Sequence, residues 1–168
     1  MKGKGRRERG TLTIREEAQR VIPDLLEDFL SRAERVVGFP SRMVELHEMR
    51  LAGKPLRYMM EFCTPNFGPE FASALEEVKR LVTLLGRTHD CDVHIPRART
   101  ELAVIRRFNR TTSQRRDRIP TMSLVQYIRR ERTLRATMYH EACGILQRWK
   151  SEALAAQIRR SLVYPPFT

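Results

Sequence analysis

The sequence predicts an all-α fold, an antiparallel bundle of about five helices, on three observations. Apolar residues recur at three- and four-residue spacing in several long segments, as they do on one face of an amphipathic helix. No segment shows the period-two alternation of a half-buried strand. Gly and Pro fall between the periodic segments, where helices usually end. The 168 residues suffice for one domain, which we expect over residues 11–163, between a basic tail at 1–10 and a C-terminal tail at 164–168.

The first helix is expected over residues 13–38. Thr13 and Glu16 have the spacing of a capping box, in which each side chain binds the other residue's backbone N–H. Pro23 should kink the helix, and Gly38 is placed to end it. The preceding residues 1–10 are almost free of apolar side chains, which predicts disorder. Whether they attract anions or are a start-site artefact stays open.

The second helix is expected to begin after Ser41, a good N-cap residue, and to run to about Cys63. One face carries an apolar row that should pack against the core, with Gly53 in the same register. Pro55 removes a backbone donor, so we expect a bend there. The apolar row consists of Leu46, Met49, Leu56, Met60 and Cys63.

Beside that row lies a row of basic side chains, His47, Arg50, Lys54 and Arg57. Their spacing of i, i+3, i+7 and i+10 confines them to an arc of roughly 80° over a length of roughly 15 Å. Like charges on one helix face cost a few tenths of a kcal/mol per pair, which favours a long anionic partner. Glu61 is placed to hold Arg57 by an i,i+4 contact. The alternative is an ordinary solvated face.

A third helix is expected from Pro69 to Gly86, with an apolar stripe on one side and Lys79 and Arg80 near its middle. We interpret Arg80 as simply solvated. The stripe consists of Phe71, Leu75, Val78, Val82 and Leu85.

Five potential metal ligands crowd the next segment, but their spacing matches no closed zinc pattern. We therefore expect no metal, and we expect Asp90 and Asp92 to cap a helix or to hold basic side chains. The other three potential ligands are His89, Cys91 and His94.

A fourth helix should follow Pro96, and residues 109–121 should form a polar loop. The last long helix begins near Met122. It carries four basic residues that are candidates to line the same site as the basic row. The alternative for each of them is ordinary exposure to solvent. Those residues are Arg129, Arg132, Arg135 and His140.

The amino-acid composition indicates which class of partner the protein binds. Lys and Arg total 32 against 20 Asp and Glu, so the formal net charge is +12, which is typical of proteins that bind a polyanion. No apolar run is long enough for a membrane span, and no secretory signal is visible. Cys63, Cys91 and Cys143 form no C-x-x-C pair and should be reduced core thiols in a cytoplasmic protein.

Two motifs resemble the CHAD family, the conserved histidine α-helical domain. H-x-x-R-x-x-x-K-x-L-R-Y covers residues 47–58, and L-L-G-R-T-H-D-C-D-V covers residues 84–93. The resemblance extends over residues 45–108 and implies a helical domain that binds inorganic polyphosphate in a basic channel without catalysis. Pro55 stands where the family often has another basic residue. The usual domain has two halves, and this chain resembles one of them, with a single motif row.

The resemblance also implies a role for Lys79, which matches a position that is often basic in the family. We therefore expect polyphosphate to contact a set of seven residues, with no cofactor, at a cytoplasmic location that includes polyphosphate granules. General polyanion or nucleic-acid binding is the alternative, and phosphotransfer is a third. The oligomeric state stays open: the protein is either a homodimer, in which the second copy supplies a second basic row, or a monomer. The seven residues are His47, Arg50, Lys54, Arg57, Lys79, Arg132 and Arg135.

Overall fold

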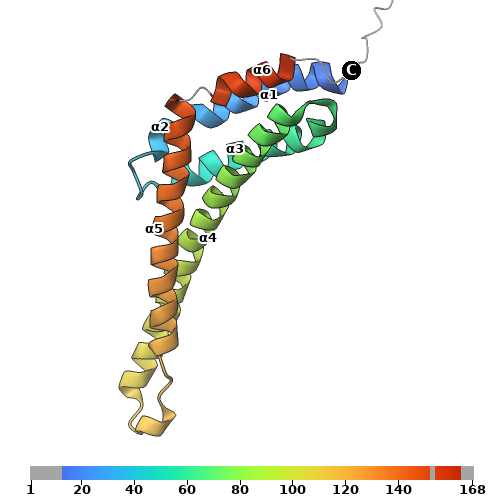
Figure 1. Cartoon of the computed structure of the whole chain (residues 1–168). Helices are drawn as coiled ribbons and strands as arrows, with labels where there is room; N and C mark the ends of the chain where they lie inside the picture. Colours follow the sequence, from blue (N-terminus) through green and yellow to red (C-terminus); the bar gives the residue numbers. More distant parts are fainter. Residues whose placement is uncertain (1–12, 152–153, 164–168) are drawn as a thin grey trace, which may run out of the picture.

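The computed structural model describes residues 13–151 and 154–163, and within these ranges it contains helices and turns but no strand. The prediction of an all-α fold with about five helices is confirmed, since one of the six α-helices is a single turn (Figure 1). The α-helices are α1 (Ile14–Ser31), α2 (Ala33–Val36), α3 (Met43–Cys63), α4 (Pro69–Thr111), α5 (Met122–Ser151) and α6 (Leu154–Val163). Two 3₁₀ turns are η1 (Thr64–Asn66) and η2 (Arg115–Asp117). The two expected tails lie outside the described residues.

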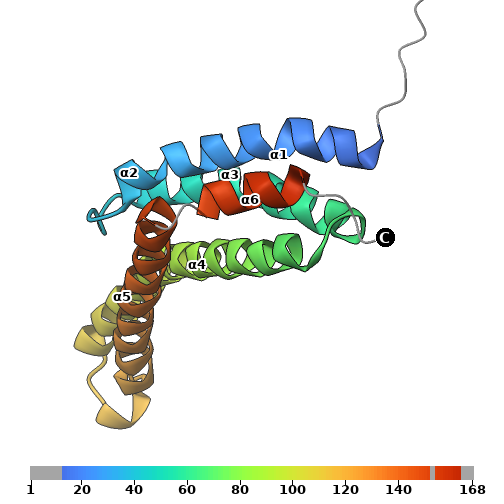
Figure 2. The same cartoon turned by 45° about the horizontal axis from the view of Figure 1, so that its top comes forward.

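The molecule has a four-helix body and a two-helix arm. In the body α1 contacts α3, α3 contacts the first part of α4, and α6 contacts both α4 and α1 (Figure 2). Beyond the body, α4 and α5 extend side by side as the arm, which ends in the loop 112–121 (Figure 1). No helix within the described ranges is long and apolar enough to cross a bilayer.

The core of the body confirms the expected apolar faces. Every member of the predicted apolar row on α3 is buried, as is the predicted stripe on α4. Gly53 lets α3 approach closely, because a Cβ there would lie 2.8 Å from Val82 Cγ2 and 2.9 Å from Phe29 Cε2. The side chains of Cys63, Cys91 and Cys143 are buried free thiols.

The capping box at the start of α1 is present. The Thr13 hydroxyl accepts from the Glu16 N–H at 3.2 Å, and the Thr13 N–H donates to the Glu16 carboxylate at 2.8 Å. The prediction of one helix from 13 to 38 is wrong, because α1 ends at Ser31 and α2 follows as a separate turn. Gly38 comes after α2 with a φ of 85°, a conformation that favours glycine.

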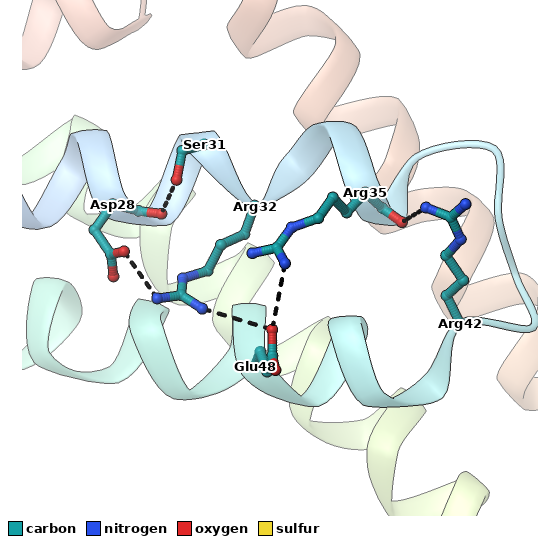
Figure 3. Close-up of polar contacts among 6 residues, drawn as sticks. All are labelled: Asp28, Ser31, Arg32, Arg35, Arg42 and Glu48. Carbon is teal, nitrogen blue, oxygen red and sulfur yellow. Dashed lines mark hydrogen bonds and ion pairs between the residues drawn. The ribbon is translucent and has the colours of Figure 1, made fainter.

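The N-terminal half of α3 is fixed to α1 and α2 by a polar network (Figure 3). Arg32 binds Asp28 at 2.9 Å, and both Arg32 and Arg35 lie 3.8 Å from the Glu48 carboxylate on α3. Arg42 donates to the carbonyl oxygen of Arg35 at 3.3 Å. Since Glu48 is tied to this side of the helix, its neighbour His47 is turned toward α4.

The expected cap at Ser41 is wrong. The N-cap residue is Arg42, whose side chain makes no capping bond, and α3 starts at Met43. The contacts that fix this end therefore come from Arg42 to α2 and from Glu48, and not from a local hydroxyl cap.

The largest departure from expectation is α4. The sequence predicted a helix end at Gly86 and a new helix after Pro96, but α4 is one helix of 43 residues that passes through both. Local propensity is a weak determinant when a long face is buried. Here α4 packs against α3, α5 and α6, and this packing stabilises helical backbone across both sites.

The last helices follow the prediction in part. The start of α5 at Met122 is confirmed, but the predicted loop 109–121 begins only at residue 112, because α4 continues to Thr111. The helix α6 was not predicted as a separate helix. The second half of α5 packs on the body, where Tyr139 donates to the carbonyl oxygen of Val36 at 2.7 Å. Arg80 is exposed, as predicted, and it also donates to Glu141 on α5 at 2.7 and 3.2 Å, a contact that was not predicted.

Candidate functional site

A set of basic side chains lines the boundary between α3 and α4, which run antiparallel with Gly53 packed against Val82. On α3 the row holds its predicted register, since α3 is helical from Met43 to Cys63. On α4 the residues Lys79, Gly86 and His89 stand at i, i+7 and i+10 and so share one face. We call this set the basic face. It consists of His47, Arg50, Lys54, Arg57, Lys79 and His89.

Two histidines meet across the helices at one end of the basic face. The rings of His47 and His89 have centroids 4.4 Å apart and an interplanar angle of 31°. Both Nδ1 atoms are buried without a hydrogen-bond partner among the described residues. Asp90 Oδ1 is 3.8 Å from His89 Nδ1, beyond hydrogen-bond distance. Buried polar atoms without a partner are uncommon, and a bound water or anion is one physical reason for them.

The middle of the basic face holds its uncompensated positive charge. Arg50 and Lys54 are half-buried, and neither has a carboxylate partner among the described residues. Arg50 lies beside Gly86 on α4, where a Cβ would be 3.5 Å from Arg50 Nε, an ordinary contact distance. The Arg50 guanidinium therefore lies close to α4.

The other end of the basic face is neutralised. Arg57 donates to Glu61 at 2.9 Å, which confirms the predicted i,i+4 contact. Lys79 binds Glu76 at 2.8 Å and lies 3.9 Å from the same Glu61 carboxylate. Two cations and two carboxylates meet here, so an anion bound at this end must compete with Glu61 and Glu76.

The two predicted residues on α5 lie apart from the basic face. Arg135 makes a two-bond contact with Asp92, in which Nε binds Oδ1 and a terminal nitrogen lies 3.2 Å from Oδ2. The same guanidinium donates to the Pro40 carbonyl oxygen at 2.7 Å. With side chains 16% and 9% exposed, Arg135 and Asp92 fasten α5 to α4 and to the loop before α3. Arg132, about one turn earlier, lines a different cavity in the arm.

The cluster of potential metal ligands is dispersed around α4. His89 faces His47, Asp92 binds Arg135, and Cys91 lies 3.4 Å from Glu131 on α5. Among the described residues no three His, Cys, Asp or Glu side chains gather as metal ligands. The expectation that Asp92 would hold a basic side chain is confirmed. Burial and the Glu131 carboxylate raise the pKa of the Cys91 thiol to about 11.

His89 lies on the basic face but is not among the predicted site residues. Lys79, Gly86 and His89 repeat the seven- and three-residue steps that relate His47, Lys54 and Arg57. A helix end at Gly86, as predicted, would separate His89 from Lys79. A continuous helix puts both on one face.

Fold and site together define a helical domain with a basic face whose middle, at Arg50 and Lys54, lacks carboxylate partners among the described residues. The family model of the CHAD domain matches residues 4–99, which is more than half of the chain. The chain belongs to the CHAD domain family, as the two motifs indicated. The match includes α1, α3 and the first two thirds of α4 and stops before α5. No match to the chain was found among the curated proteins or among the solved structures.

Proposed function

We propose that this protein binds inorganic polyphosphate on the basic face and does not catalyse its turnover. The observation that carries the proposal is the convergence of Arg50 and Lys54, which lack carboxylate partners, with the packed rings of His47 and His89. A phosphate chain offers oxygen acceptors at regular intervals, which suits a linear row of donors. The family match supports a phosphate-polymer partner.

The proposed contacts between the basic face and phosphate fall into two groups, those of free cations and those of cations already paired with a carboxylate. Arg50 presents a planar fork that suits bidentate phosphate binding, and Lys54 adds a point charge about one turn away. Arg57 and Lys79 contribute once an anion displaces them from Glu61 and Glu76. Binding is therefore centred on the histidine end of the face. Arg132 and Arg135 are secondary in this proposal, because Arg135 is already bound by Asp92.

The test is a competition. Polyphosphate should displace duplex DNA from the protein at equal phosphate concentration, and log affinity should fall linearly with log salt. Replacing Arg50, Lys54 and Arg57 together by Ala should nearly abolish binding while helix content stays unchanged. Wild-type affinity in the triple variant would show that the basic face is only solvated, and preference for DNA would favour the nucleic-acid alternative.

Absence of turnover is tested directly. Polyphosphate and nucleoside triphosphates incubated with the protein and magnesium should remain intact, because the six residues of the basic face include no Ser, Thr or Cys nucleophile. Steady phosphate release that disappears with His47→Ala would instead support a phosphotransfer function.

The homodimer remains part of the proposal. The outward face of α3, next to the basic row, exposes apolar side chains that a second copy could cover, namely Val44, Leu51, Tyr58 and Phe62. A two-fold pair through this face would bring a second basic row near the first. Light scattering at low salt, with and without polyphosphate, decides the question. A mass near 19.7 kDa under both conditions would rule the dimer out.

A further inference from the structure

The arm contains a cavity of about 740 Å³ between the second half of α4 and the first half of α5. Arginines from both helices surround it, and it shares no lining residue with the basic face. Four of the five arginines lie beyond the residues that the CHAD family matches. They are Arg99, Arg106 and Arg110 on α4 and Arg129 and Arg132 on α5.

These arginines carry uncompensated charge. No carboxylate lines the cavity, and none of the five guanidinium groups has an ion-pair partner among the described residues. Elsewhere on the same helices Arg80 is paired with Glu141 and Arg135 with Asp92. The helices thus have paired arginines where they join the body and unpaired ones around this cavity.

The arginines around the cavity are spaced so that they repel one another along each helix, which lowers the stability of the helix. Arg106 and Arg110 are four residues apart on α4, and Arg129 and Arg132 are three apart on α5. Like charges at these spacings destabilise a helix. A multivalent anion in the cavity would remove this cost for both pairs at once.

The apolar residues that line the rest of the cavity favour an anion with an organic group over a plain phosphate polymer. Leu102 and Ile128 are buried and, with the half-buried Val125 and with Ala103, form an apolar wall. A phosphate polymer has nothing to place against such a wall. A flat organic group does, and a guanidinium can also stack on its face. The cavity volume lies within the range of about 300–1,000 Å³ that small-molecule sites occupy.

We propose that this cavity binds a nucleoside polyphosphate, with its phosphates on the arginines and its base against Leu102, Val125 and Ile128. The inference is independent of the proposed polyphosphate binding on the basic face. The arm would then join a small-molecule site to the family domain, and the two sites would be separated by the Arg135–Asp92 pair.

The experiment titrates the full chain with ATP, tripolyphosphate and adenosine in magnesium-free buffer by calorimetry. ATP should bind more tightly than tripolyphosphate. R106A/R129A should weaken ATP binding about tenfold or more, the effect of losing charge-assisted phosphate contacts. A second variant, R110A/R132A, should give a comparable loss. The matched control R97A/R107A removes the same charge from exposed positions on α4 outside the cavity and should change affinity less than twofold.

Three results would overturn the proposal. Equal weakening by R97A/R107A would mean that ATP responds only to net charge. Tripolyphosphate binding as tight as that of ATP would mean that the apolar wall plays no part. A single-stranded oligonucleotide that binds this cavity more tightly than ATP would assign it to nucleic acid. The comparison of ATP with tripolyphosphate is repeated in R50A/K54A, which removes phosphate binding at the basic face, so failure of the basic face and failure of this site are separable.

Discussion

The imidazole ring of His47 on α3 packs against that of His89 on α4, with ring centroids 4.4 Å apart and an interplanar angle of 31°. The two residues are 42 positions apart in the sequence and belong to different motifs. Their contact joins the H-x-x-R row to the L-G-x-x-x-D-x-D segment, so that the two motifs meet in the candidate site. The ring of His89 also limits the orientations that the His47 ring can take.

His89→Ala should therefore weaken polyphosphate binding by a factor similar to that of His47→Ala, although His89 lies outside the basic row of α3. The double variant should lose less than the sum of the two single losses, because each ring positions the other. Fluorescence titration with labelled polyphosphate measures all three. Wild-type affinity in His89→Ala would show that the ring contact does not serve binding.

Glu61→Gln should strengthen polyphosphate binding. The Glu61 carboxylate holds Arg57 at 2.9 Å and lies 3.9 Å from Lys79, so its removal frees both cations. Exposed pairs contribute about 0.2–1 kcal/mol, so we expect affinity to rise by a factor of about 1.4 to 5. Glu101→Gln makes the same charge change at an exposed site on the arm and is the control. An equal gain in the control would attribute the effect to net charge.

Arg135→Ala should destabilise the fold, whereas Arg132→Ala should not. Arg135 is mostly buried and leaves Asp92 without its partner when it is removed, which we expect to cost about 2–3 kcal/mol. Arg132 is exposed on the same helix and has no carboxylate partner within the described part of the chain. Urea denaturation of both variants measures the difference. Equal stability would show that the Arg135–Asp92 contact is energetically unimportant.

The glycines at Gly53 and Gly86 should respond oppositely to alanine. At Gly53 the added Cβ would lie within 3.0 Å of Val82 and Phe29, and such overpacking costs about 1–3 kcal/mol. At Gly86 the nearest atom is Arg50 Nε at 3.5 Å, an ordinary contact. Alanine is favoured over glycine in a helix by about 1 kcal/mol, so Gly86→Ala should be stabilising. Thermal unfolding midpoints that moved in the same direction would contradict this packing.

Stability should fall at alkaline pH through Cys91. The pKa of its thiol rises from 9.0 to about 11 on folding, so the folded chain keeps a proton that the unfolded chain loses between these pH values. The contribution is complete below pH 9 and is lost as pH rises toward 11. Between pH 8 and pH 10 the free energy of unfolding should drop by about 1 kcal/mol more in wild type than in Cys91→Ala. Urea denaturation at both pH values is the measurement, and parallel losses in the two proteins would contradict it.

Local interactions account for the elements that were predicted correctly. The Thr13–Glu16 capping box and the Arg57–Glu61 contact join residues three and four apart, a separation at which helical geometry alone brings side chains together. The apolar row of α3 was identified by its period for the same reason. These features depend on short-range geometry.

The errors arose where distant contacts override local preference. Gly86 and Pro96 suggested helix ends, and no neighbouring residue indicated the ion pair of Arg80. The packing of α4 against α3, α5 and α6 keeps it helical through both sites, and Glu141 on α5 binds Arg80. Neither outcome is encoded in the neighbouring residues, because the stabilising partners come from other helices.

The sequence by itself determined the all-α class, the cationic row His47, Arg50, Lys54 and Arg57, and membership of the CHAD family. Only the tertiary structure decided which cations keep their charge uncompensated. Charge compensation depends on side chains brought together from different helices, so Arg135 is bound by Asp92 while Arg132 faces the cavity of the arm. A helical period fixes the direction of a side chain, but its electrostatic environment is fixed by the partner helix across from it.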